Sequence, residues 1–224
     1  MDTLSWLLSP EEPGPRYLAL RDVLRRPPDD PELRAARAAA HAAPPIAAIL
    51  DAQHRDGYWD RPGPGYAAKY CSTVWAIIAL GQLGASVDAD PRVARGAAYL
   101  LDNALPPGGQ FSTNRAPSGT ADCLQGNLLA ALLALGVDDP RLDGAFEWLA
   151  RTVTGEGLSA VGDKSAPRRY YAGKCGPLFA CGANAGLPCA WGAVKVMLAL
   201  GALRAVGQDS SCLPPEDRMN PVPR

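Results

Sequence analysis

The stretch YCSTVWAIIALGQLG, residues 70–84, decides the fold because it recurs twice along the chain. The matching stretches are DCLQGNLLAALLALG at residues 122–136 and PCAWGAVKVMLALGA at residues 188–202. Each has a cysteine in second position, followed by an apolar run of helical length. Glycine closes the first two runs, as is typical of helix C-termini. Internal repetition of this kind predicts a repeating helical architecture.

A second kind of helix is predicted before and between these repeats. The segments PELRAARAAAHAA, PRVARGAAYLLDNAL and PRLDGAFEWLARTV each follow an aspartate, at Asp30, Asp90 and Asp139. Aspartate is a natural N-cap, and proline suits the first helical position. These segments carry charge on one side, whereas the cysteine-headed runs are apolar nearly all round. The sequence therefore predicts an all-α fold of helical hairpins, with inner helices parallel to one another and antiparallel to an outer layer.

The pattern divides the chain into three regions. Residues 1–44 are expected to form N-terminal covering helices that prolines break into short pieces, and residues 45–205 hold the repeats. Residues 206–224 are rich in prolines and polar residues, so we expect a flexible tail there.

Composition and charge exclude several classes of function. The 224 residues are 47% hydrophobic with a net charge of -1, and basic and acidic residues are interspersed, so we expect no nucleic-acid partner. The N-terminus lacks the basic start of a secretion signal, and no apolar run approaches the roughly 20 residues that span a bilayer. We therefore expect a cytoplasmic protein, whose six cysteines are thiols, metal ligands or catalytic groups rather than disulfides.

A short motif adds a family resemblance to this pattern. The segment QHRDGYW, which runs from Gln53 to Trp59 with Gly57 between them, resembles the QW motif of the squalene cyclase and protein prenyltransferase β-subunit superfamily. GGQF at residues 108–111 and GEGL at residues 155–158 look like degenerate copies. In such a turn the glutamine amide caps a neighbouring helix while the indole packs over it.

The resemblance covers about residues 45–203 and implies an (α/α) toroid with a central apolar pocket. Because the chain is shorter than the six-hairpin barrels of that superfamily, we expect a ring that is small, open, or completed by another subunit in a homo-oligomer. The implied activity is that of a terpene cyclase or prenyltransferase acting on an isoprenoid or similar apolar substrate. The D-x-D-D motif with which squalene-type cyclases protonate their substrate is absent from the sequence.

The resemblance also concerns a metal site. Prenyltransferase β-subunits hold zinc with an aspartate, a cysteine two residues later and a histidine from a later helix. Here Asp122 stands directly beside Cys123, and the two histidines, His41 and His54, both lie upstream, so the match is partial.

The cysteines themselves suggest a metal site at the rim of the inner helices. The three repeats bring their cysteines to the same end of the helices, and the insertion before the third repeat adds two more. The best four-ligand set is Cys123, Cys175, Cys181 and Cys189, whose thiolates suit zinc or, as a second choice, an iron–sulfur cluster.

Other roles for these cysteines stay open. His54 or Asp122 could replace one metal ligand, and the cysteines of the insertion and third repeat could instead pack or form a loop disulfide. For Cys71 we favour simple core packing. Cys123 or Cys189 could be a nucleophile whose thiol pKa is lowered by the helix N-terminus. The candidate catalytic residues are therefore Cys123, Cys189 and Asp122.

Two features point to a substrate site beside these cysteines. One helical turn further along the inner helices, aromatic and small residues would line a pocket. The loop KSAPRRYYAGK, residues 164–174, would suit a diphosphate or carboxylate head group. The alternatives are ordinary helix packing and a solvated basic loop. The candidate substrate-binding residues are Trp75, Asn127, Arg168, Arg169, Tyr170 and Lys174.

Two functions compete on this basis. The first is a terpene cyclase or prenyltransferase-like enzyme with a cysteine-rich rim. The second is a non-catalytic binding or scaffold protein in which the cysteines form a structural metal site.

Overall fold

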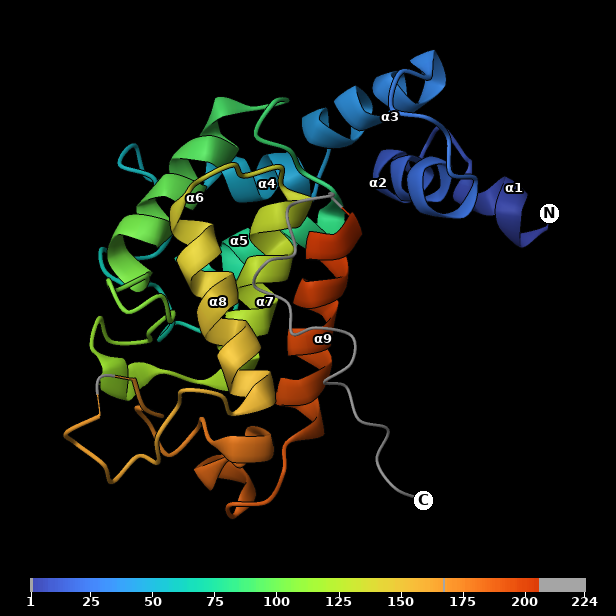
Figure 1. The fold of residues 1–224 in the computed structure, drawn as a ribbon. Helices are drawn as coiled ribbons and strands as arrows, with labels where there is room; N and C mark the ends of the chain where they lie inside the picture. Colours follow the sequence, from blue (N-terminus) through green and yellow to red (C-terminus); the bar gives the residue numbers. More distant parts are fainter. Residues whose placement is uncertain (1, 167, 206–224) are drawn as a thin grey trace, which may run out of the picture.

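The computed structural model describes residues 2–166 and 168–205. Within these ranges the fold is all-α: extended pairing is limited to isolated β-bridges, and no strand forms. Figure 1 shows the arrangement of the helices. Their bounds are α1 Thr3–Leu7, α2 Pro13–Leu18, a π-helical turn Ala19–Val23, α3 Pro31–Ala42, α4 Ile46–Asp51, α5 Thr73–Leu83, α6 Pro91–Ala104, α7 Asp122–Ala134, α8 Arg141–Thr154 and α9 Ala190–Ala205. Over the described ranges, no helix combines the length and the apolarity that crossing a bilayer requires.

The inner helices α5, α7 and α9 form a parallel row. A Cβ added at Gly81 of α5 would lie 3.0 Å from Ala131 of α7, and one added at Gly126 of α7 would overlap Lys195 of α9. Successive contacts keep the same order along each pair of helices: Gly192 of α9 faces Asp122 one turn before Lys195 faces Gly126, and the Val87 N–H, beyond Gly81, bonds the Leu135 carbonyl, beyond Ala131. The axes of each pair therefore run in the same direction. Helices α6 and α8 run in the opposite direction on the outer side of the row (Figure 1). The all-α prediction is confirmed, and α5 with α6 and α7 with α8 pair as inner and outer helices, whereas α3, predicted as a further outer helix, packs mainly on α2.

The sequence repeat reappears as a repeated hydrogen bond. The buried Trp59 donates its backbone N–H to Thr73 Oγ1 at 3.1 Å, fourteen residues later. The buried Phe111 donates its backbone N–H to Gln125 Oε1 at 2.6 Å, also fourteen residues later. Each acceptor is buried in the first turn of an inner helix, so each aromatic residue is fixed against the helix that follows it.

The QW-like segment ties α4 to α6. Gln53 Nε2 donates to the Arg92 carbonyl at 2.9 Å, and Trp59 Nε1 donates to the Ile49 carbonyl at 2.6 Å. Gly57 has a φ of +101°, and a Cβ there would meet the α6 backbone at 2.7 Å, so the turn requires glycine. The segment therefore joins neighbouring helices, but the glutamine does not cap α6 as the motif implies, because its amide donates to a carbonyl of the first turn and its oxygen accepts no N–H from a described residue.

The predicted aspartate caps are present, with one boundary shifted. Asp30 and Asp90 cap α3 and α6 as predicted. Helix α8 begins at Arg141, one residue later than predicted, because Pro140 takes the N-cap position while the Asp139 carboxylate accepts the Arg141 N–H at 2.9 Å.

The N-terminal helices pack on the end of the inner row. Tyr17 and Leu20 are buried, and the Tyr17 ring closes on Gly84, where α5 ends in the left-handed conformation. The predicted tail at residues 206–224, with Cys212, lies outside the described residues.

We expect the Thr73→Val substitution to lower the free energy of unfolding by about 1–2 kcal/mol, because it leaves the buried Trp59 N–H without an acceptor at nearly constant volume. Urea unfolding measures this difference. Thr3→Val, at an exposed position of α1, is the control and should change little. Equal stability of the Thr73 variant and wild type would contradict the proposed role of this hydrogen bond.

Candidate functional site

Asp122, the first residue of α7, is the most unusual polar group of the described chain. Only 3% of the surface of Asp122 is exposed to solvent. Oδ2 accepts the Gly176 N–H across a long 3.4 Å, while Oδ1 is buried without a hydrogen-bond partner among the described residues. A carboxylate in such a place is poorly solvated, so its neutral form is favoured.

Burial therefore raises the pKa of Asp122 from 3.8 to about 7, and the Gly176 N–H opposes this shift only in part. At neutral pH both the protonated and the ionised forms are populated. A carboxyl group in this condition can give up a proton or accept one near physiological pH.

A small second core adjoins Asp122. It consists of Trp148, Tyr170 and Cys175, all buried. Trp148 Nε1 and the Tyr170 hydroxyl have no hydrogen-bond partners within the described ranges. Burial, and next the Asp122 charge, raise the pKa of Tyr170 and that of Cys175, the latter to about 12. Cys175 is consequently a neutral thiol at physiological pH.

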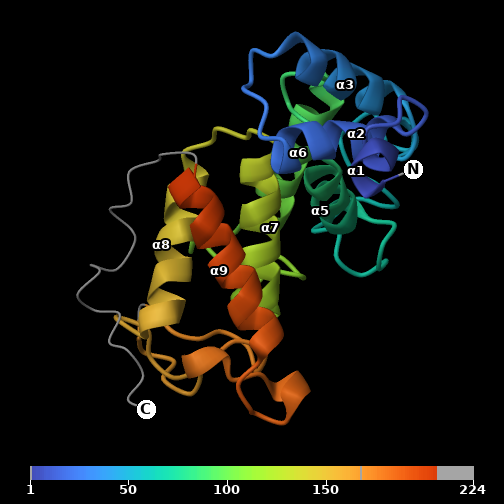
Figure 2. The same cartoon turned by 90° about the vertical axis from the view of Figure 1, so that its right-hand side faces the viewer.

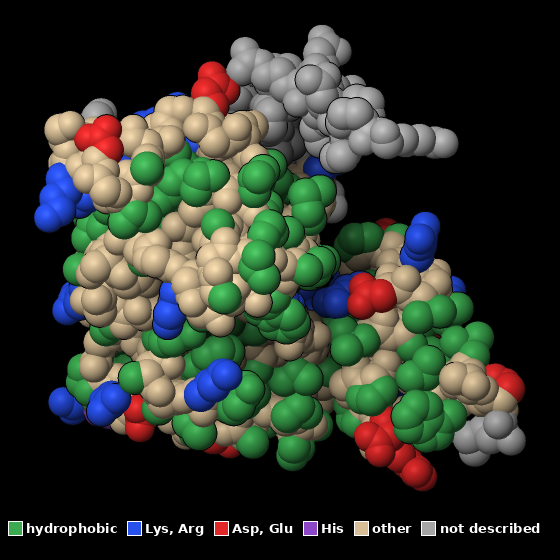
Figure 3. Space-filling model, turned by 90° about the horizontal axis from the view of Figure 1, so that it is seen from below, with side chains coloured by type: hydrophobic (Ala, Val, Ile, Leu, Met, Phe, Trp, Pro, Cys, Tyr) green, Lys and Arg blue, Asp and Glu red, His purple; other side chains and the backbone are tan. Residues whose placement is uncertain are grey.

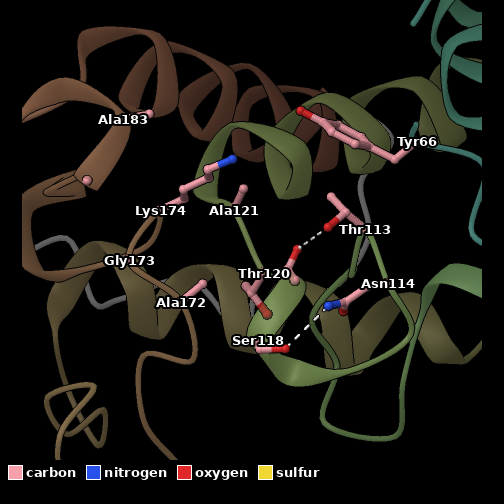
Figure 4. Close-up of a pocket in the computed structure, with 12 residues that line it drawn as sticks. Tyr66, Thr113, Asn114, Ser118, Thr120, Ala121, Ala172, Gly173, Lys174 and Ala183 are labelled. Carbon is pink, nitrogen blue, oxygen red and sulfur yellow. Dashed lines mark hydrogen bonds between the residues drawn. The ribbon is translucent and has the colours of Figure 1, made fainter. Parts of the chain in front are cut away.

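A polar pocket of about 500 Å³ lies beside the start of α7, where Ala121, the residue before Asp122, is part of its lining (Figure 4). The loop 112–120 forms one wall, where Thr113 Oγ1 donates to the Gly119 carbonyl and Asn114 Nδ2 donates to Ser118. The segments 172–174 and 182–183 form the other. The lining residues are Tyr66, Thr113, Asn114, Ser118, Gly119, Thr120, Ala121, Ala172, Gly173, Lys174, Gly182 and Ala183.

Lys174 is the charged member of this lining. Figure 4 shows its side chain extending toward Ala121, at the start of α7. No acidic side chain of the described ranges forms an ion pair with it. The backbone carbonyl of Lys174 accepts the backbone N–H of Asp122 at 3.4 Å. This hydrogen bond joins the segment that carries Lys174 to the start of α7, where the buried acid lies.

The predicted substrate-binding residues lie in different parts of the structure and do not form one site. Lys174 lines the pocket, whereas Tyr170 lies in the second core. Arg168 lies 3.9 Å from Glu147 of α8, and Arg169 donates to the Val161 carbonyl, so neither contributes to the pocket lining.

The inner-helix candidates also lie outside the pocket lining. Trp75 Nε1 donates to the carbonyl of Tyr66, which does line the pocket, and Asn127 is half-buried on α7. The hydroxyl and amide groups of the loop 112–120 were missed as candidates. Their signal was the run STNRAPSGT, whose composition is typical of a turn rather than of a site.

The prediction that Cys71 packs in the core is wrong, because this residue is exposed. The physical reason is the neighbouring Ser72, which is buried at the N-cap of α5. Its hydroxyl lies 2.6 Å from the Gly65 carbonyl and 2.8 Å from the Ala68 carbonyl. The inward position at this turn is thus occupied by the serine.

The remaining described cysteines lie near the start of the inner helices, and all are free. Burial raises the pKa of the Cys123 thiol, and Cys189, Asp122 and Cys181 add to the increase. The expectation of a thiol activated by the helix N-terminus is therefore wrong for Cys123. Among the described residues, no group of three or more His, Cys, Asp or Glu is placed to hold a metal ion. The predicted zinc or iron–sulfur site stays a prediction without structural support.

Comparison of the chain with protein-family models, curated proteins and solved structures finds no match. The resemblance to the cyclase and prenyltransferase superfamily accordingly stays a prediction, and the function has to be argued from the site.

Proposed function

We propose that the protein is an enzyme that transfers a proton to or from a small substrate bound in the polar pocket, with Asp122 as the acid–base residue. The observation that carries this proposal is the buried Asp122 carboxyl with an unpartnered oxygen. Buried polar atoms are nearly always hydrogen-bonded, and exceptions often occur at functional sites. A pKa of about 7 matches what proton transfer at neutral pH requires.

The surroundings of Asp122 suit this role. Ala121 and Lys174 both line the pocket, and Asp122, which follows Ala121 and donates its backbone N–H to the Lys174 carbonyl, adjoins this lining without being part of it. The segment 172–176 reaches from the pocket lining to the carboxyl: Gly173 lines the pocket, where its carbonyl accepts the Gly182 N–H, and Gly176 donates its N–H to Asp122 Oδ2. A small displacement of this segment would bring substrate and carboxyl together. Asp122 would then donate its proton, remain as a carboxylate and recover a proton from water.

The pocket lining supports a substrate with a charged or hydroxylated head group. Lys174 would supply the countercharge, and the loop 112–120 would supply hydroxyl and amide hydrogen bonds. An isoprenoid tail is the substrate class that the family resemblance implies. The parallel inner row with its antiparallel outer layer supports the corresponding fold, a small or incomplete (α/α) toroid.

The competing function is a non-catalytic binding or scaffold protein with a structural cysteine metal site. The polar pocket alone is compatible with binding. The unpartnered carboxyl beside it favours catalysis, because buried acids with raised pKa values are concentrated at catalytic sites.

A deuterium-exchange experiment tests the proposal. Wild-type protein is incubated in D₂O with farnesyl diphosphate, and solvent deuterium in the recovered isoprenoid is measured by mass spectrometry. We expect incorporation that Asp122→Asn slows about 100-fold, as loss of an acid–base residue does. Asp138→Asn, at an exposed position, is the control and should behave like wild type. A protein that binds the probe without any deuterium incorporation would instead be the binding protein.

We expect Lys174→Met to weaken binding of inorganic diphosphate at least about 10-fold, because the pocket loses its countercharge. Isothermal titration calorimetry measures the affinity. Lys164→Met removes a lysine of the same basic loop that lies outside the pocket lining. If both variants lost affinity for diphosphate equally, binding would depend on the total positive charge of the loop and not on the pocket.

A further inference from the structure

Helix α9 has an apolar face that no described residue covers. It buries one side against α7 through Val196, Ala199 and Leu203. On the opposite side the exposed large residues are Trp191, Val194, Met197 and Leu198, and the Trp191 residue is 61% exposed. These positions recur at helical spacing, so they form one continuous stripe. Contiguous apolar surface on a helix is typical of an interaction site.

The charge of this face is positive. Lys195 lies with Nζ 4.6 Å from the centroid of the Trp191 ring, and Arg204 stands near the end of the helix. Neither forms an ion pair with a described residue, and α9 contains no acidic residue. A matching partner would therefore be apolar and acidic.

The N-terminal arm, which we define as residues 2–15, has this character. Trp6 is 55% exposed, Leu4 is exposed beside it, and α1 buries none of its residues. Residues 2–15 contain three acids, Asp2, Glu11 and Glu12, and no lysine or arginine. The arm stands out from the body in Figure 1, and Figure 3 shows a hollow between this projecting part and the body.

We infer that the arm of a second copy of this chain covers α9, in a two-fold dimer in which each copy provides both an arm and an α9 face. Complementary charge selects this occupant, because the acidic arm meets the basic face while Trp6 and Leu4 meet the apolar stripe. The arm and α9 of one copy both lie on the side of the molecule that faces the viewer in Figure 2. A two-fold axis on that side places both contacts in one self-complementary interface.

Sedimentation equilibrium of the full chain tests this interface. We expect a dimer whose dissociation constant rises at least 10-fold in Trp191→Asp and in Trp6→Ala. Val161→Asp, an exposed apolar position away from both elements, is the control and should associate like wild type. A wild-type chain that is monomeric at concentrations on the order of 100 µM would overturn the inference. A dimer that Trp191→Asp dissociates and Trp6→Ala leaves intact would also overturn it, because α9 would then have another cover.

A charge exchange identifies the partner segment. The double variants Glu11→Lys/Glu12→Lys and Lys195→Glu/Arg204→Glu should each fail to dimerise, because like charges face each other in both contacts. Mixed together they should form a heterodimer, since each arm then meets an α9 of opposite charge. Absence of a heterodimer, with both variants folded by circular dichroism, would overturn the pairing of arm and α9.

Discussion

Replacing Asp122 with asparagine should stabilise the protein above pH 7, and the gain should disappear as the pH falls toward 4. The pKa of this carboxyl is about 7 in the folded state against 3.8 for an ordinary aspartate. Between these values the unfolded chain is ionised while the folded chain holds a proton, so wild-type stability falls as the pH rises through this window. The shift corresponds to on the order of 4 kcal/mol, and asparagine does not titrate.

Urea unfolding at pH 4, 6 and 8 measures this dependence. The difference in free energy of unfolding between Asp122→Asn and wild type should grow with pH and level off above pH 7. Asp138→Asn, the same substitution at an exposed position, is the control. A difference for Asp122→Asn that is constant from pH 4 to pH 8 would mean that Asp122 titrates as it does in the unfolded chain, and would remove the basis for its catalytic role.

A second large effect is expected at Gly126, where α7 and α9 touch. A Cβ at this position would overlap the carbonyl carbon and oxygen of Lys195, and a helix backbone gives way much less than a side chain end. We expect Gly126→Ala to lower the free energy of unfolding by about 3 kcal/mol, the upper end of the usual range for overpacking. The outcome is measured by urea unfolding at constant pH.

Gly144→Ala is the matched control for this substitution. Gly144 lies inside α8, and an added Cβ would meet nothing within 4 Å. Alanine should therefore stabilise this helix by about 0.5–1 kcal/mol. Similar losses at both positions would show that general helix effects, rather than the α7–α9 contact, govern Gly126.

The sequence predicted the helical hairpins because their signals are local. Apolar runs headed by cysteine and Asp-Pro starts each depend on a few neighbouring residues, and their bounds agree with the structure to within about three residues. The recurrence of the cysteine-headed runs, with an outer-helix segment between successive copies, also predicted that the inner helices run parallel. The start of α8 was placed one residue early, since Asp139 bonds the Arg141 N–H from outside the helix.

The candidate site was predicted less well because it depends on contacts between distant segments. The pocket forms where the loop 112–120 meets the segments 172–174 and 182–183, and no periodic pattern links them. Asp122 was a candidate by its place beside Cys123, but its unusual ionisation arises from enclosure by the segment around Gly176. The prediction for Cys71 failed because only one residue of the tight turn before α5 faces the core, and that residue is the neighbouring Ser72.

The row arrangement places α7 at the centre of the described helices, in contact with α5 on one side, α9 on the other and α8 in the outer layer. In proteins built from stacked units, cooperativity passes from neighbour to neighbour. We therefore expect the arm and the loop segments to open without disturbing α7, and α7 to loosen only when the whole row comes apart. Asp122 stands at the first turn of that helix, so we expect the acid to be held by the part of the chain that opens last, while the neighbouring pocket loops belong to the parts that open first.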